Sequence, residues 1–209
     1  MVIWMIHYLL FDSRLSYFFQ VLPFSVLIGI VYIIIRFHSL RKKLSLKPNI
    51  GRETSKVLFV CYIAGLLALV CTPPNFWTAI WFNLIHHHPK MELSPLFHGG
   101  FNFKPSLFRY IRGTLTGGSW AAFMQFGNAL LFLPFGFLLP FCIKKVKAHR
   151  IIGIAFISSL AIELIQPIIS RSFDVDDLIN NTLGAAIGYF IYYITSKILL
   201  FLRKKYPLS

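Results

Sequence analysis

The sequence predicts an all-α polytopic membrane protein with five transmembrane helices, the N-terminus outside and the C-terminus inside. Hydrophobic residues make up 56% of the 209 residues, whereas charged residues make up only 13%. Soluble domains carry about 25% charged residues, so this chain lacks the polar surface of a water-exposed globule. The net charge is +14, yet the basic residues stand in short clusters between long uncharged runs. Such clusters indicate membrane topology, and no nucleic-acid partner is expected.

Five apolar windows are expected to cross the membrane, since a helix needs about 20 apolar residues to span roughly 30 Å of hydrocarbon. The first covers residues 16–35. Pro73 and Pro74 divide the next uncharged run, so the second is a short or tilted span over residues 57–72. The third lies within residues 113–143 and starts near Ala121. The fourth runs from residue 151 to about 169, and the fifth from 178 to about 202.

Basic residues set the expected orientation, because cytoplasmic loops attract Lys and Arg. Fourteen of them fall in segments that would lie inside, and six in segments that would lie outside. The long outer loop, residues 75–120, is expected to hold a helix on the membrane surface, since apolar residues recur there at helical spacing. They are Phe76, Trp77, Ile80, Trp81 and Leu84. We assign residues 1–56 to the first helix with its basic loop, and residues 57–209 to a four-helix membrane domain.

Four polar side chains from three spans are expected at a common depth: Asn128, Glu163, Gln166 and Asn181. With a rise of about 1.5 Å per residue, Glu163, Asn128 and Asn181 lie roughly 9, 10 and 6 Å below the outer boundary. An ionisable group inside the bilayer rarely persists without a partner. The sequence therefore predicts a polar pocket that opens to the outer face.

The loop between the fourth and fifth spans is densely charged. Within residues 170–177 it carries Arg171, Asp174, Asp176 and Asp177. Asp176 or Asp177 is expected to cap the fifth span, since Asp side chains accept bonds from the first backbone N–H groups of a helix. Alternatively, Asp174, Asp176 and Asp177 could hold Mg²⁺ or Ca²⁺ against a phosphate, because hard cations take oxygen ligands.

Glu163 is the one acid of the fourth span, and two roles for it stay open. A structural hydrogen bond to Gln166, Asn128 or Arg171 would hold the helices together, with Arg171 as the natural ion partner. Alternatively, the carboxyl group could act as a proton donor or acceptor, because acids embedded in the membrane are functional by default.

A combination of residues in the second half of the chain carries a family resemblance. In order, these residues are Asn128, Leu130, Leu131, Phe132, Pro134, Phe135, Gly136, Glu163, Gln166, Arg171, Phe173, Asp174, Asp177, Asn181, Thr182 and Gly184. Together they resemble the VanZ-like family of bacterial membrane proteins, over residues 58–193 and with a weaker Asn-x-x-Pro match at residues 102–105. The resemblance implies a bacterial plasma-membrane protein. The family's founding member confers resistance to teicoplanin, a glycopeptide that targets lipid-linked cell-wall precursors.

The first functional hypothesis is a non-enzymatic envelope protein that engages a lipid headgroup or a lipid-linked cell-wall precursor. Its partners are then membrane lipids or such precursors, and by engaging them the protein would lower the susceptibility of the bacterium to glycopeptides. Arg171, with Arg109 or Arg112, would bind phosphate, because guanidinium groups match phosphate geometry. The remaining ligand-binding residues are expected to be Asn128, Gln166, Asp174 and Asn181.

Two other functions are weighed against it. In a membrane-embedded enzyme that modifies a lipid headgroup, Glu163 would be the general acid or base, and Asp177 with Asp174 would orient a metal ion or water. A proton-coupled transporter would use Glu163 as its proton carrier. It ranks last, because the inner halves of the spans carry almost no polar side chains.

Overall fold

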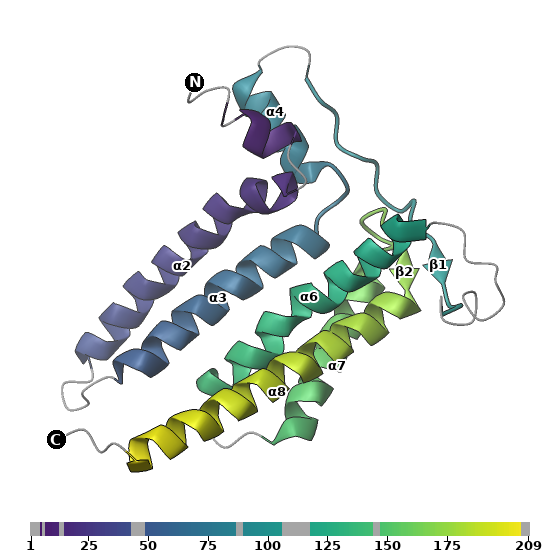
Figure 1. Ribbon diagram of the computed structural model, residues 1–209. Coiled ribbons are helices and arrows are strands. Elements are labelled where there is room, and N and C mark those ends of the chain that lie inside the picture. Colours follow the sequence, from purple (N-terminus) through teal and green to yellow (C-terminus); the bar gives the residue numbers. More distant parts are fainter. Residues whose placement is uncertain are drawn as a thin grey trace. The chain divides into compact units, whose positions relative to one another are not determined.

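Most of the described chain is helical. The computed structural model describes residues 5, 7–12, 15–42, 49–86, 90–105, 118–143 and 147–205. The elements are, in order, a π-helix η1 (Tyr8–Asp12), helices α2 (Ser16–Lys42), α3 (Ile50–Val70) and α4 (Phe76–Ile85), strand β1 (Phe101–Asn102), helices α6 (Gly118–Cys142) and α7 (Ala148–Ile165), strand β2 (Phe173–Asp174) and helix α8 (Val175–Lys205) (Figure 1).

Within the described residues, four helical segments are long and apolar enough to cross a membrane: Ser16–Leu40, Ile50–Val70, Ala148–Ile165 and Val175–Leu202. They correspond to the first, second, fourth and fifth predicted spans. The third predicted span corresponds to α6, in which Phe126–Cys142 is a shorter apolar stretch. The protein is therefore a helical membrane protein, as expected, whereas the five-span count and the orientation stay predictions.

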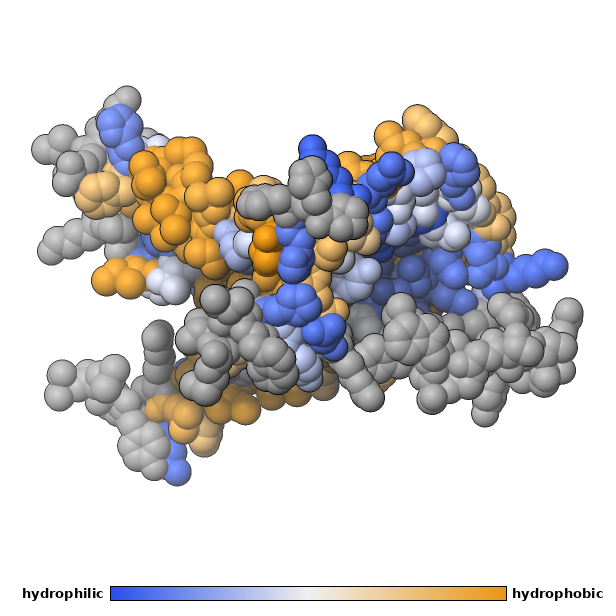
Figure 2. All heavy atoms as spheres, turned by 90° about the horizontal axis from the view of Figure 1, so that it is seen from above, coloured by the Kyte–Doolittle hydropathy of each residue, from blue (hydrophilic) through white to orange (hydrophobic). Residues whose placement is uncertain are grey.

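Large apolar side chains are exposed along these helices. On α2, Ile34 and Ile35 are 62% and 60% exposed, and on α8 Phe190 is 61% exposed. Figure 2 shows hydrophobic residues, in orange, over wide areas of the surface seen from above. Soluble monomers rarely expose large contiguous apolar patches, so these helix faces fit contact with lipid.

The chain divides into two compact units. Unit 1 contains Met1–Asn102 and Ile162–Phe173, and unit 2 contains Phe103–Ala161 and Asp174–Ser209. Each unit therefore joins segments that are distant in the sequence. The boundary predicted after residue 56 stays a prediction.

In unit 1, α2 and α3 pack closely along their length. The Ser25 hydroxyl on α2 donates to the Cys61 carbonyl of α3 at 2.6 Å. Gly29 approaches Cys61 so closely that a Cβ atom would collide with the sulfur. Small residues at such positions let two helix backbones approach, which is a common packing device between membrane helices.

Three charged side chains join the ends of α2 and α3 that lie farthest from α4. Arg36 donates to Glu53 through Nε at 2.7 Å and through Nη2 at 2.9 Å. Lys56 Nζ donates to the same carboxylate at 2.7 Å. The bidentate Arg–carboxylate geometry makes this a specific and strong contact, which fixes the two helices against each other.

The predicted surface helix is present as α4, but its two tryptophans contact the long helices. Trp77 Nε1 donates to the Ala68 carbonyl on α3 at 2.7 Å, and Trp81 Nε1 donates to the Gln20 carbonyl on α2 at 2.8 Å. The indole N–H groups therefore tie α4 to both helices of unit 1. The position of α4 on the membrane surface stays a prediction.

In unit 2, glycines allow α6 and α8 to approach backbone to backbone. A Cβ atom at Gly184 would collide with the Ala129 carbonyl, and one at Gly136 would collide with the Ala185 carbonyl. One turn further along α8, Gly188 lies equally close to the Leu133 carbonyl. This close approach brings polar side chains of α6 and α8 within hydrogen-bonding distance.

Candidate functional site

Asp174 is the acid that caps α8. It immediately precedes Val175, the first residue of the helix, and its Oδ1 accepts a bond from the Asp176 N–H at 2.9 Å. Acidic residues at this position satisfy a free backbone donor and complement the helix dipole. The sequence predicted a cap from Asp176 or Asp177, and this was wrong because α8 begins three residues earlier than the predicted fifth span.

Asp177 binds a side chain from another helix. Asn128 on α6 donates its Nδ2 hydrogen to Asp177 Oδ1 in the first turn of α8. Both residues were predicted as site residues, although the sequence did not pair them. The bond joins two helices of unit 2 side chain to side chain, and both groups are partly buried.

Asn181 lies one turn further along α8 and makes a second pair. Its Nδ2 donates to the Ser159 hydroxyl of α7 at 2.9 Å, and the two side chains are 6% and 0% exposed. Ser159 was not among the predicted residues. Its signal in the sequence is the spacing of four residues to Glu163, which puts both on one face of α7.

Glu163 is buried near the end of α7, with 1% of its surface exposed. With its amide turned to satisfy both neighbours, Gln166 Nε2 donates to Glu163 Oε2 at 3.2 Å and to the Ser172 carbonyl at 2.9 Å. Gln166 was one of three partners predicted for this acid, and this contact is confirmed. The helix ends at Ile165, before the predicted residue 169. Pro167 explains the early end, because proline cannot donate to the Glu163 carbonyl.

Arg171 caps the end of α3. Its Nε donates to the Thr72 carbonyl and its Nη2 to the Leu69 carbonyl, each at 3.0 Å. The last carbonyls of a helix lack partners within the helix, and a cation there also complements the helix dipole. Burial lowers the pKa of the guanidinium group. The sequence paired Arg171 with Glu163, whereas these two bonds tie it to the backbone of α3.

A segment of the predicted outer loop forms backbone hydrogen bonds with the residues on both sides of Arg171. The Phe97 N–H donates to the Ile168 carbonyl at 2.9 Å, and the Phe173 N–H donates to the Gly100 carbonyl at 3.0 Å. Gly99 lies so close to the Pro167 and Arg171 backbones that a side chain could not fit. Strands β1 and β2 extend this pairing as a two-stranded sheet. Sequence reasoning did not anticipate these strands.

Some predicted residues lie elsewhere. Arg109 and Arg112 are outside the described residues. Among the residues that are described, no group of three or more His, Cys, Asp or Glu side chains is arranged to hold a metal ion. Asp174 caps α8 and Asp177 accepts a bond from Asn128, and the Mg²⁺ or Ca²⁺ site on Asp174, Asp176 and Asp177 stays a prediction.

The observed pairs therefore fall into two sets. Unit 2 contains Asn128 with Asp177 and Asn181 with Ser159. Unit 1 contains Glu163 with Gln166, and Arg171 on the end of α3. The common pocket that the sequence predicted for these residues stays a prediction.

Comparison with known proteins identifies the family. The chain matches the family model described as VanZ/LLP1 over residues 59–199, a region that includes all the predicted site residues. It is similar to Protein VanZ from Enterococcus faecium, with 26% identity over 148 residues that cover 70% of this chain and 78% of that protein. No solved structure matches the chain. The protein therefore belongs to the VanZ/LLP1 family.

Proposed function

We propose that this protein lowers the susceptibility of a bacterium to glycopeptides of the teicoplanin type. It does so from the plasma membrane, by engaging a lipid headgroup or a lipid-linked cell-wall precursor through polar residues at the outer ends of its helices. Membership of the VanZ/LLP1 family supports the resistance role. The arrangement of polar side chains supports recognition of a polar ligand.

The observation that carries the proposal is the Asn128–Asp177 pair. A polar group inside an apolar helix bundle costs free energy even when it is hydrogen-bonded, and apolar residues of similar size are often more stable. Among the described residues, this bond joins one side chain to another rather than to a backbone group. Polar side chains kept in membrane helices without such a need are functional-site candidates by default.

Arg171 extends the chemistry of the site. Carboxylate and amide groups recognise the N–H and O–H groups of sugars and peptides, and the partly buried Asp177 and Asn128 supply such groups. Arg171 supplies the positive charge for phosphate. A guanidinium group has five N–H donors, and the two bonds to α3 use two of them. The others are the donors that we assign to phosphate oxygens.

Growth inhibition in a susceptible Gram-positive host tests the proposal. The host expresses wild-type protein, Glu163→Gln or Asp177→Asn at equal membrane levels, and is challenged with teicoplanin and with vancomycin. We expect the wild type to protect against teicoplanin more than against vancomycin, and both variants to lose this protection. Glu92→Gln is the matched control, because it makes the same change at an exposed acid outside the site. If the wild type gives no protection, or if both variants protect fully, the proposal is wrong.

A further inference from the structure

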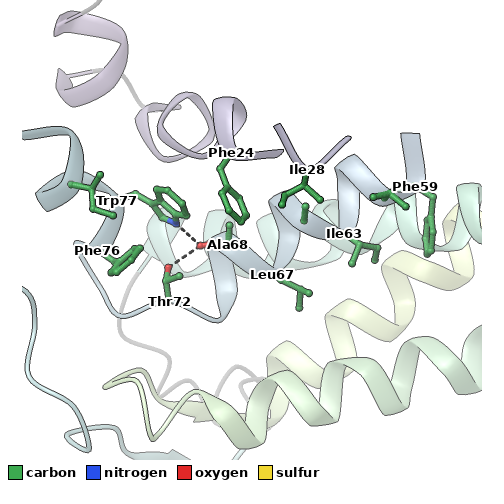
Figure 3. A pocket seen from close by; sticks show the side chains of 12 residues that line it. Phe24, Ile28, Phe59, Ile63, Leu67, Ala68, Thr72, Phe76 and Trp77 are labelled. Carbon is green, nitrogen blue, oxygen red and sulfur yellow. Dashed lines mark hydrogen bonds between the residues drawn. The ribbon is translucent and has the colours of Figure 1, made fainter. Parts of the chain in front are cut away.

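An apolar groove lies on unit 1 between α2, α3 and α4, with a volume of about 710 Å³ (Figure 3). Phe24 and Ile28 of α2 form one wall, and Ile63 and Leu67 of α3 form the other. Aromatic side chains of α4, among them Trp77, lie at one end of the groove (Figure 3). Its outline is therefore set by three helices that also contact one another directly.

The two polar groups in the groove lining are both turned toward the backbone. Thr72 Oγ1 donates to the Ala68 carbonyl at 2.8 Å, and Trp77 Nε1 donates to the same oxygen at 2.7 Å (Figure 3). These bonds leave only carbon atoms to face an occupant. A surface of this kind binds hydrocarbon and offers nothing to a sugar or a peptide backbone.

The length of the groove matches a lipid chain. Its lining on α3 extends from Phe59 to Ala68, which is about 14 Å at a rise of 1.5 Å per residue, and it continues to Thr72 just beyond the helix. One leaflet of a bilayer is about 15 Å thick in its hydrocarbon part. The groove is therefore long enough for one acyl chain of a phospholipid, whereas the much longer polyisoprenyl chain of a cell-wall carrier would extend beyond it.

A positive charge stands at the end of the groove near α4. Thr72 lines the groove, and its carbonyl accepts the bond from Arg171 Nε at 3.0 Å. An apolar groove with a cation at one end is complementary to a hydrocarbon chain with an anion at one end.

We infer that this groove binds one acyl chain of an anionic phospholipid and that Arg171 binds its phosphate. The inference rests on the proposed function for the role of Arg171, and it adds the class of lipid and the place of its chain. Arg171 then does two things at once. It holds the end of α3 through two N–H groups and the lipid phosphate through others.

Photo-crosslinking of the full chain tests the inference. The purified protein is placed in phosphatidylcholine nanodiscs that contain traces of phosphatidylglycerol with a photoactivatable group in its acyl chain, and labelled peptides are identified by mass spectrometry. A parallel sample uses phosphatidylcholine with the same group. We expect phosphatidylglycerol to label the groove walls on α2 and α3 roughly tenfold more than phosphatidylcholine does, because the choline cation of phosphatidylcholine competes with Arg171 for the phosphate that both lipids carry.

Matched variants test where the acyl chain and the phosphate of the lipid bind. Ala64→Trp fills the groove and should abolish labelling, whereas Ala161→Trp makes the same change at an exposed alanine outside the lining and should not. Arg171→Gln should bring phosphatidylglycerol labelling down to the phosphatidylcholine level, and Arg171→Lys should keep most of the preference. If Ala64→Trp does not accumulate, Ile28→Trp fills the groove from the α2 wall.

The outcomes separate this inference from the proposed function. Equal labelling by the two lipids, or labelling that survives groove filling, overturns the inference even if the wild type protects against teicoplanin. Selective labelling that depends on Arg171 supports the inference even if the wild type gives no protection, in which case only the proposed function fails. Displacement of the label by a polyisoprenyl pyrophosphate but not by unlabelled phosphatidylglycerol would also overturn it.

Discussion

The polar residues around Arg171 and those between α6, α7 and α8 differ in what they bind. In unit 1, Arg171 donates to the backbone carbonyls of Thr72 and Leu69, and Ser170 donates to the carbonyl of Pro95. In unit 2, Asn128 binds the Asp177 side chain. Nearby, Asn181 binds the Ser159 side chain.

This difference helps to distinguish side chains that the fold requires from side chains that are candidates for a role in function. Carbonyls at a helix end need partners in any protein, so a side chain that supplies them is explained by the fold alone. A hydrogen bond between two side chains on different helices satisfies no backbone N–H or C=O group, and apolar residues could replace such a pair. The pairs of unit 2 are therefore the better indicators of function, and Arg171 combines a structural role with a proposed binding role.

The largest effect on stability is expected from Arg171→Ala. It removes two charge-assisted bonds to the end of α3, so the free energy of unfolding should fall by about 3 kcal/mol. Unfolding in mixed detergent micelles measures this, with Arg171→Lys as a control that keeps the charge and part of the bonding. A stability equal to that of the wild type would show that α3 does not depend on Arg171, and would contradict the structural role that the comparison gives to this residue.

Ser159→Ala should have the next largest effect. It leaves the buried Asn181 amide without its hydroxyl acceptor, which should cost about 1.5 kcal/mol. The double variant Ser159→Ala with Asn181→Leu removes both partners and should be more stable than the single variant, because no polar group is left unsatisfied. The same unfolding assay measures both. A double variant less stable than Ser159→Ala would mean that the pair is needed for packing.

Asp174→Ala should have a smaller effect, because it removes one capping bond to the first turn of α8. We expect a loss of about 1 kcal/mol. Asp174→Asn keeps an oxygen acceptor in the same place and should lie within a few tenths of a kcal/mol of the wild type. Equal losses in the two variants would show that the charge of Asp174, rather than its capping bond, stabilises the helix.

The sequence predicted where the helices lie better than where they end. Uncharged runs located α2, α3, α7 and α8, because apolar length is what a membrane requires. However, α3 begins at Ile50 rather than at residue 57. Its first turns contain Glu53 and Lys56. Glu53 accepts bonds from both Lys56 and Arg36, so these turns remain helical despite their charge. Hydropathy predicts which segments lie in the membrane, whereas capping residues and ion pairs determine where each helix begins and ends.

The candidate site was predicted in its residues but not in its partners. Depth along each helix selected Asn128, Glu163, Gln166 and Asn181, since helical rise is regular. The partner of each depends on how the helices rotate and approach, and here glycines such as Gly184 set the approach. The bond from Arg171 to Thr72 joins residues 99 positions apart. No local pattern in the sequence specifies such a contact.

Asp177→Asn gives the most direct test that the unit 2 pair serves function rather than folding. The variant keeps an oxygen that can accept the Asn128 bond, so its shape and hydrogen bonding are preserved and only the charge is lost. Detergent unfolding and teicoplanin protection are measured on the same variant at matched membrane levels. We predict wild-type stability together with loss of protection. Full protection, or a loss of protection that is matched by a loss of stability, would contradict a functional role for this carboxylate.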